Sequence, residues 1–103
     1  MRIFKEPLRF EWDEGNRDKN LIRHGVTNEE SEEVFFDPHK RIIEPPLLNG
    51  GEERYLLIGR TQQQRLLFVV FTMRGSAIRV ISARNLGTKE RRLYDKATEG
   101  PSV

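Results

Sequence analysis

Three apolar segments in the second half of the chain constrain its fold more than any other feature. Residues 54–61, 66–74 and 77–84 are rich in Val, Ile, Leu and Phe, which favour β-strands. Residues 62–64 join the first two segments, and Gly75 and Ser76 join the last two. Both linkers have the length of hairpin turns. The pattern therefore predicts a three-stranded antiparallel meander.

The order of polar and apolar side chains predicts which strand faces are buried. Residues 66–71 are apolar at every position, which is typical of a central strand buried on both faces. The third segment alternates, so Arg79 and Arg84 fall on opposite faces of its strand. We therefore expect one of these arginines to be structural, unless a β-bulge changes the register between them.

The N-terminal half predicts a short strand and two helices. Residues 8–12 alternate and include aromatic side chains, as a strand does. Asp13 is a suitable cap for a helix over residues 14–24, which ends directly before a glycine. Thr27 and Glu30 have the spacing of a capping box, which predicts a second helix that runs to about residue 36.

The remaining segments complete a single domain over residues 1–103. Residues 41–53 contain two prolines and an Asn-Gly-Gly turn, so they predict at most one short edge strand followed by a turn. Residues 88–97 predict a polar helix, and residues 98–103 a disordered tail. The predicted class is α+β, with two N-terminal helices packed on a small antiparallel sheet and a helix at the C-terminus. One face of that sheet is then free to bind a partner.

Length and composition exclude several classes of protein. A chain of 103 residues buries about 60 to 65% of its unfolded surface, which leaves no room for a deep cofactor cleft. The absence of cysteine removes disulfides and thiolate zinc sites and suits a reducing compartment. The longest apolar run, residues 66–71, is far shorter than the ~20 residues of a membrane span. We expect a cytoplasmic protein with no membrane segment and no cofactor.

Charge is divided unevenly between the two halves of the chain. Residues 1–53 hold 13 acidic and 8 basic side chains, whereas residues 54–103 hold 3 acidic and 10 basic ones. Of the 18 basic residues 13 are arginines, whose planar guanidinium suits two-point contact with phosphate. A polyanion such as RNA is one candidate partner. The alternative is that the two halves fold together and neutralise each other.

Few side chains are available for catalysis. The two histidines, His24 and His39, do not have the spacing of a metal site, and no glycine-rich phosphate loop is present. We therefore expect no metal. RNA scission by the substrate's own 2′-hydroxyl needs less apparatus, because the protein must only align the groups, stabilise charge and shuttle protons. His24 either shuttles the proton or simply caps the end of its helix.

Several short motifs, read in order along the chain, resemble those of one protein family. They are Phe10-Glu11-Trp12-Asp13, Asn20-Leu21-Ile22-Arg23-His24-Gly25-Val26, Glu33-Val34-Phe35 with Asp37, Gly59-Arg60, Ile81-Ser82-Ala83-Arg84, and Glu90-Arg91 with Tyr94. Over residues 8–95 the set resembles the BrnT family, toxins of type II toxin-antitoxin systems related to the RelE/ParE superfamily. The resemblance implies a RelE-like fold and a ribonuclease that cuts RNA without a metal and inhibits translation.

The resemblance also implies a site. The residues that match its active-site positions are His24, Arg60 and Arg84. The expected RNA contacts are Arg23, Arg74, Arg79, Arg91 and Tyr94. For Tyr94 the alternative is that the ring packs the last helix on the sheet.

The partners implied are RNA and a BrnA-like antitoxin whose ribbon-helix-helix portion binds operator DNA. The chain would then form a hetero-oligomer with the antitoxin and meet DNA only through it, with an acidic antitoxin segment on the basic surface. The family pattern has lysines where this chain has Asn16 and Arg23. Because the charge is lost at Asn16, the alternatives are an attenuated enzyme and a non-catalytic module that binds nucleic acid or protein.

Overall fold

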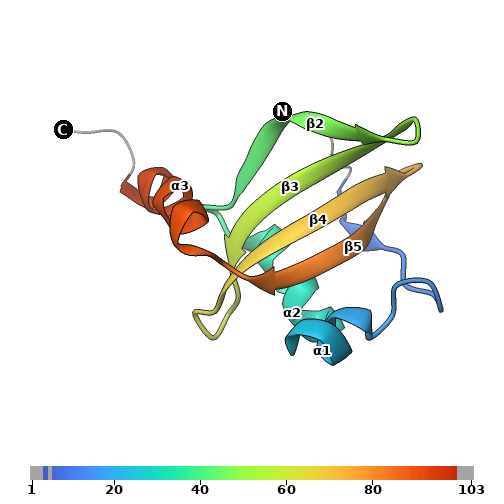
Figure 1. The fold of residues 1–103 in the computed structure, drawn as a ribbon, viewed down its shortest axis with the longest axis horizontal. Coiled ribbons are helices and arrows are strands. Elements are labelled where there is room, and N and C mark those ends of the chain that lie inside the picture. The colour runs from blue at the N-terminus through green and yellow to red at the C-terminus, as the bar shows by residue number, and fades with distance from the viewer. Residues whose placement is uncertain (1–3, 5, 100–103) are drawn as a thin grey trace.

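The computed structural model describes residues 4 and 6–99 and contains a five-stranded sheet (Figure 1). The strands lie in the order β1-β5-β4-β3-β2. Their bounds are β1 (Arg9–Phe10), β2 (Arg41–Asn49), β3 (Glu52–Arg60), β4 (Leu66–Arg74) and β5 (Ala77–Asn85). The helical elements are α1 (Lys19–His24), α2 (Asn28–Glu33), the 3-10 helix η1 (Val34–Phe36) and α3 (Thr88–Glu99).

The predicted meander is present within a larger sheet. β3 pairs antiparallel with β4, and β4 with β5, as the hairpin-length linkers indicated. The sheet is mixed rather than purely antiparallel, because β1 pairs parallel with β5. These two strands are far apart in the chain, so no tight turn forces them to be antiparallel. The α+β class is confirmed, but α1 and α2 lie between β1 and β2 in the chain rather than ahead of the sheet.

β2 is longer than the short edge strand that its prolines predicted. It pairs with β3 on both sides of an interruption between Ile43 and Leu47. Pro45 and Pro46 fall inside that interruption, where their missing backbone donor costs no ladder hydrogen bond. β2 is the last strand in the sheet order, so its outer edge has no partner strand among the described residues.

The first helix is shorter than predicted, because residues 14–18 form turns and α1 begins at Lys19. The side chain of Asn16 is buried in this segment. Its amide nitrogen donates to the carbonyls of Glu11 and Val80, each at 3.0 Å. Its oxygen accepts from the backbone N–H of Asp13 at 2.9 Å. These side chain to backbone bonds compete with helix formation and hold the segment against β5.

The second helix follows the prediction closely. The Thr27 hydroxyl accepts from the backbone N–H of Glu30 at 3.0 Å, and the Glu30 carboxylate accepts from that of Thr27 at 2.9 Å, so the capping box is confirmed. α2 continues as η1, which ends at residue 36 as expected. α3 runs two residues beyond the predicted helix. Residues 98 and 99 of the expected tail are therefore helical, and residues 100–103 lie outside the described residues.

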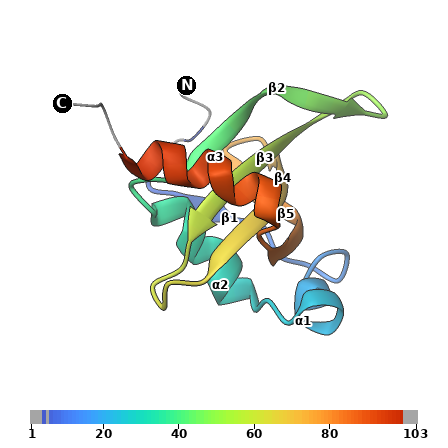
Figure 2. The same ribbon diagram turned by 60° about the vertical axis from the view of Figure 1, so that its left-hand side comes forward.

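The hydrophobic core lies between the sheet and η1. Val34 and Phe35 pack with Leu67, Val69 and Phe71 of β4, and all five are at most 1% exposed. Leu66, Phe68 and Val70, which lie on the opposite face of β4, are only half-buried, so the expectation of burial on both faces is wrong. Figure 2 shows why: α3 crosses only one end of that face, where it packs against β2 and β3.

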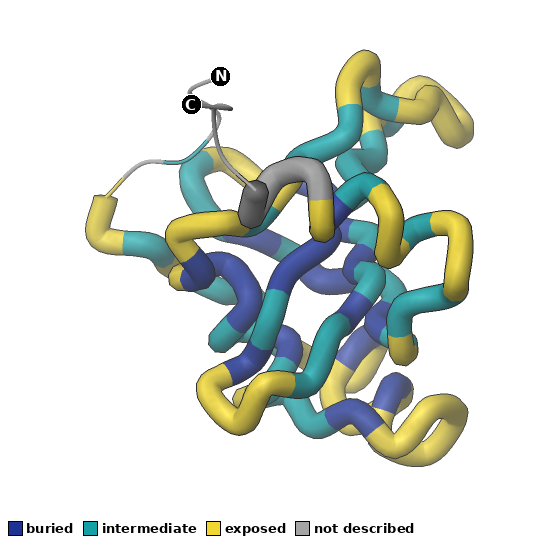
Figure 3. Tube along the Cα trace, turned by 90° about the vertical axis from the view of Figure 1, so that its left-hand side faces the viewer, coloured by how far each residue is buried: buried dark blue, intermediate teal, exposed yellow. Residues whose placement is uncertain are grey.

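The buried positions lie in the middle of the molecule and the exposed ones follow its turns and ends (Figure 3). The part of the chain that the structure describes has no helix that is long and apolar enough to cross a membrane.

Candidate functional site

A β-bulge places two strand arginines on the same face of the sheet. The β4–β5 ladder shifts register between Val70 and Phe71, so that Ile81 of β5 is an extra, unpaired residue. The bulge interrupts the alternation between Arg79 and Arg84. Both arginines therefore lie on the sheet face opposite the core, which we call the open face. Strict alternation predicted opposite faces unless a β-bulge intervened, and the structure contains that bulge.

At the α3 end of the open face lies a concave site that we call the basic pocket. It has a volume of about 400 Å³, and no acidic residue lines it. Its lining residues are Arg60, Gln64, Arg65, Leu66, Asn85, Leu86 and Arg91. Several guanidinium groups around one hollow favour the binding of an anion such as phosphate.

Arg60 stands at the end of β3 and forms one wall of the basic pocket. Its guanidinium lies 5.3 Å from the centroid of the Tyr94 ring, and its Nη1 donates to Gln64 Oε1 at 3.0 Å. Its Nε is buried and has no hydrogen-bond partner among the described residues. A buried donor that is left unpaired is costly.

Tyr94 packs α3 on the sheet beneath this pocket. The residue is 1% exposed, and its hydroxyl donates to Asp37 Oδ2 at 2.7 Å. The same carboxylate oxygen accepts from the backbone N–H of Arg60 at 2.8 Å. Burial, together with the hydrogen bond to Asp37, raises the pKa of Tyr94 to about 12. The ring thus supports Arg60 from below and does not line the pocket.

Arg84 lies at the same end of the open face, and its charge is already paired. Its two terminal nitrogens donate to the two carboxylate oxygens of Glu90 at 3.0 and 2.7 Å. Its guanidinium also stacks on Phe68, 4.3 Å from the ring centroid. The hydrogen bonds between Arg84 and Glu90 raise the pKa of the arginine and lower that of the carboxylate. Glu90, which sequence reasoning did not place in the site, fixes the direction of the guanidinium.

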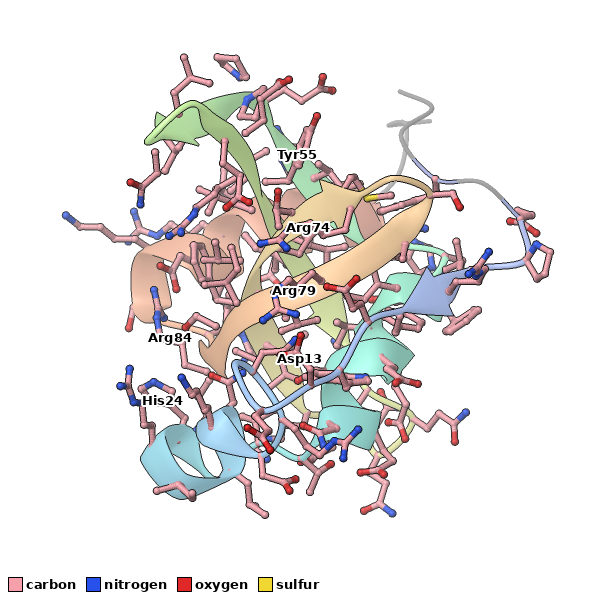
Figure 4. The ribbon with its side chains drawn as sticks, turned by 90° about the vertical axis from the view of Figure 1, so that its right-hand side faces the viewer. Asp13, His24, Tyr55, Arg74, Arg79 and Arg84 are labelled. Carbon is pink, nitrogen blue, oxygen red and sulfur yellow. The ribbon has the colours of Figure 1, made fainter. Side chains whose placement is uncertain are left out.

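His24 is exposed at the C-terminal end of α1, on the same side of the molecule as Arg84 (Figure 4). The helix is fixed to β5, because the backbone N–H of Ala83 donates to Asn20 Oδ1 at 3.0 Å. Asn20 is one helical turn before His24, and Ala83 directly precedes Arg84. The structure therefore brings the predicted imidazole and this guanidinium to one end of the sheet.

Arg65 is a residue of this region that sequence reasoning missed. Its Nη1 donates to the carbonyl of Gly25 at 2.8 Å and to both oxygens of Glu30 at 3.1 Å. Its Nε donates to Asn85 Oδ1 at 2.9 Å. Arg65 thus ties the end of α1, which carries His24, to the end of β5. No local signal marks it, because the partners of its side chain are all distant in the chain.

Two other predicted residues, Arg74 and Arg79, lie away from the basic pocket. Arg79 is 14% exposed and donates to Glu11 at 2.9 Å and to both oxygens of Asp13 at 2.8 and 2.9 Å. These hydrogen bonds help to lower the pKa of Asp13 to about 2. Arg74 is half-exposed at the end of β4, 3.5 Å from the carboxylate of Glu52.

The remaining predicted contacts are exposed. Arg91 lines the basic pocket from α3, and Arg23 lies on α1 without an ion-pair partner among the described residues. Asn16, where the family pattern has a lysine, is occupied in holding the β1–α1 segment to β5. Within the described residues no three histidine or carboxylate side chains gather in a way that would hold a metal ion.

The mixed sheet, its open face and the basic pocket define a small α+β protein with a site suited to a polyanion. A similar fold is found in the crystal structure of the ribonuclease toxin BrnT of Brucella abortus, with a TM-score of 0.60 and 25% identity. That match covers 79% of this chain and 99% of the other. The model of the family described as the ribonuclease toxin BrnT of type II toxin-antitoxin systems matches residues 12–90. The chain therefore belongs to the BrnT family.

The family membership confirms the resemblance read from the motifs. It also gives the coarse function: the chain is a ribonuclease toxin of a type II toxin-antitoxin system, with an antitoxin as its partner and RNA as its substrate. No curated protein matches the sequence.

Proposed function

We propose that the chain is a metal-independent endoribonuclease whose substrate supplies its own nucleophile. The 2′-oxygen attacks the adjacent phosphorus and gives up its proton, a bond to the 5′-oxygen breaks, and that oxygen takes up a proton. The products are a 2′,3′-cyclic phosphate and a 5′-hydroxyl. The observation that carries the proposal is the basic pocket, which several arginines and no acidic residue line. Fixed cations of this kind stabilise the charge that develops on a phosphorane-like transition state.

The catalytic roles fall to His24, Arg60 and Arg84. Arg60 lines the pocket, so its guanidinium is suited to hold the scissile phosphate. Arg84 is oriented by Glu90 and Phe68 and adds positive charge beside it. His24, exposed on the neighbouring helix end, shuttles protons, because imidazole exchanges protons near neutral pH.

The RNA contacts extend from this centre over the open face. Arg23, Arg74 and Arg91 are all exposed. Arg23 and Arg91 meet RNA phosphates close to the pocket, and Arg74 meets the RNA further along the sheet. Arg79 and Tyr94 have buried or paired side chains, so we assign them to holding the frame of the site rather than to the RNA itself.

A second candidate function is a module that binds RNA without cutting it. The pairing of Arg84 with Glu90 favours it, because an arginine whose charge is neutralised contributes less to a transition state. This candidate predicts binding that weakens steeply with salt and no cleavage. Cleavage that is lost in folded Arg60→Ala or Arg84→Ala variants would exclude it.

The partner proposed is an antitoxin with a ribbon-helix-helix portion, which binds operator DNA and carries the toxin to it in a hetero-oligomer. The support is the family, whose toxins act in type II systems, and the exposed basic side chains, which suit an acidic segment. Co-expression of the chain with the antitoxin encoded beside it tests this partner. A stable complex that shifts operator DNA is expected, and free chains would contradict it.

The activity is tested with a short synthetic RNA in a buffer that contains EDTA. We expect cleavage products with 2′,3′-cyclic phosphate and 5′-hydroxyl ends, identified by mass spectrometry. The variants His24→Gln and Arg60→Ala, purified in the same way, control for contaminating nucleases. Arg9→Ala is a matched control, because Arg9 is exposed on β1 and pairs with Ala77 at the hairpin end of the sheet. RNA that stays intact under conditions where a related toxin cleaves would contradict the proposal.

A further inference from the structure

The helix that carries His24 also presents two adjacent aliphatic side chains to solvent. Leu21 is 46% exposed and Ile22 is 84% exposed. α1 is only six residues long and is held in place by the bonds of its polar side chains, such as Asn20, to β5. Its outward-facing aliphatic pair therefore contributes little to the core. Neighbouring apolar side chains on a rigid surface are typical of a contact with another protein.

The side chains around this pair are basic. α1 contains no acidic residue, and Lys19, Arg23 and His24 are all exposed. The nearest carboxylate in the chain, Asp18, accepts a hydrogen bond from the Asn28 amide at 3.0 Å. The surface thus has an apolar centre with a rim that is cationic apart from Asp18, which is the arrangement of a small protein interface.

We propose that this α1 surface is the docking site of the antitoxin and that it receives an acidic, amphipathic segment. The inference rests on the proposed function only in taking the chain to be a toxin with an antitoxin partner. The apolar side of the segment would cover Leu21 and Ile22, and its carboxylates would meet Lys19 and Arg23. Charge complementarity of this kind selects the partner and speeds association.

The chemistry of the pair favours a protein over RNA as the occupant. Single-stranded RNA is held by aromatic side chains that stack on its bases and by cations that meet its phosphates. Leucine and isoleucine offer neither a ring nor a donor. A segment seated on α1 would also cover His24, the last residue of the helix, so that docking and loss of cleavage are expected to occur together.

The chain offers two matched comparison surfaces. Leu48 on β2 is 76% exposed, which makes it a second aliphatic side chain in open solvent on another element. Phe36, 64% exposed, lies in a groove of about 490 Å³ whose lining includes Glu29, Glu32, Glu33 and Asp37. That groove has the opposite charge, so it would suit a basic segment instead.

The experiment measures the affinity of the full-length chain for the antitoxin encoded beside it, by titration calorimetry. We expect Ile22→Ser to weaken binding at least tenfold, because a central apolar contact carries much of the energy of an interface. Leu48→Ser should leave the affinity unchanged. Arg23→Glu should weaken binding further and reduce its dependence on salt. Circular dichroism establishes that each variant is folded, as expected for such exposed positions.

Three outcomes would overturn the inference. Unchanged affinity in Ile22→Ser is the first. A loss of affinity in Phe36→Ser that exceeds the loss in Ile22→Ser is the second, and it would place the antitoxin in the acidic groove. The third is weaker RNA binding by Ile22→Ser in the absence of antitoxin, which would assign the aliphatic pair to the RNA that Arg23 and His24 are proposed to meet. Docking is measured without RNA. The affinity for the antitoxin therefore tests this inference even if the nuclease proposal fails.

Discussion

The two ends of the open face carry the same type of side chain in opposite electrostatic settings. At the α3 end no acidic residue lines the pocket, whose arginines are Arg60, Arg65 and Arg91. Toward the β4–β5 hairpin the arginines have carboxylate partners: Arg54 and Arg74 pair with Glu52, and Arg79 pairs with Glu11 and Asp13. Arg65 and Arg84 at the α3 end pair with Glu30 and Glu90, but the guanidinium groups of Arg60 and Arg91 have no carboxylate partner among the described residues. The α3 end therefore keeps part of its positive charge for a ligand, whereas the hairpin end uses its charge within the fold.

This difference shows that the number of arginines in a strand does not locate a phosphate site. Of the two interpretations of the charge division, mutual neutralisation describes the hairpin end, where the N-terminal segment supplies the carboxylates. Attraction of a polyanion describes the α3 end. Variants that remove single arginines or their hydrogen-bond partners test this comparison.

The largest effect is expected from Arg84→Ala. If its guanidinium stabilises charge in the transition state, its removal costs about 2–4 kcal/mol, a loss of about 30- to 900-fold in kcat/KM for RNA cleavage. Arg84→Lys should retain part of the activity, because it keeps the charge but not the two-point geometry. Arg9→Ala, at the hairpin end of the sheet, should match the unmodified chain. Equal kcat/KM in folded Arg84→Ala would place this residue outside the site.

Next comes a contrast between Arg91→Ala and Arg79→Ala. We expect Arg91→Ala to weaken RNA binding and to lower the salt slope of the binding constant by about one, as the loss of one phosphate contact does. Its urea unfolding midpoint should not change. Arg79→Ala should lower the urea unfolding midpoint and leave RNA binding unchanged, because it leaves Glu11 and Asp13 without their shared partner. The comparison fails if both variants behave alike in the two assays.

A smaller effect is expected from Tyr94→Phe. Loss of the hydrogen bond to the buried Asp37 should lower the free energy of unfolding by about 1–2 kcal/mol. Cleavage by the folded variant should stay the same, since the ring lies beneath the pocket. The alkaline absorbance titration should lose its step near pH 12, which belongs to the raised pKa of Tyr94. Reduced cleavage at unchanged stability would instead make Tyr94 an RNA contact.

The smallest effect concerns Asp13 at acid pH. Its pKa in the folded chain is about 2, below the ordinary value of 3.8, so its ionised form stabilises the fold above that ordinary value. This contribution is lost as the pH falls through the folded-state pKa. Urea unfolding between pH 5 and pH 2 should therefore depend less on pH in Asp13→Asn than in the unmodified chain. Parallel pH profiles would show that the pairing with Arg79 has no effect on stability.

Much of the fold follows from signals that span only a few residues. The hairpin linkers predicted β3, β4 and β5, and Thr27 with Glu30 predicted the start of α2. The parallel pairing of β1 and the length of β2 were not predictable in this way. The pairing of β1 depends on strands that meet after the chain has crossed the molecule, for which no local pattern exists. β2 is joined to β3 by a short turn, but its length depends on the interruption that accommodates Pro45 and Pro46, which the residue types alone did not indicate.

The sequence named candidate site residues but not how the fold arranges them. His24, Arg60 and Arg84 do gather toward one end of the sheet, but their neighbours Arg65 and Glu90 were not assigned to it. The bulge at Ile81 has no marker residue such as glycine, so simple alternation placed Arg79 and Arg84 on opposite faces. The sequence indicated only that Asn16 lacks the charge of the family's lysine, whereas in the structure its side chain hydrogen-bonds to the backbone of β5.

The sequence by itself determined the strands, the helix caps and the family, because each depends on residue type and spacing along a short stretch of chain. Only the tertiary structure decided which arginines are neutralised and which surround a pocket. The partners of Arg79 are 66 and 68 residues away in the chain, and a guanidinium keeps its charge for a ligand only where the fold brings no carboxylate to it.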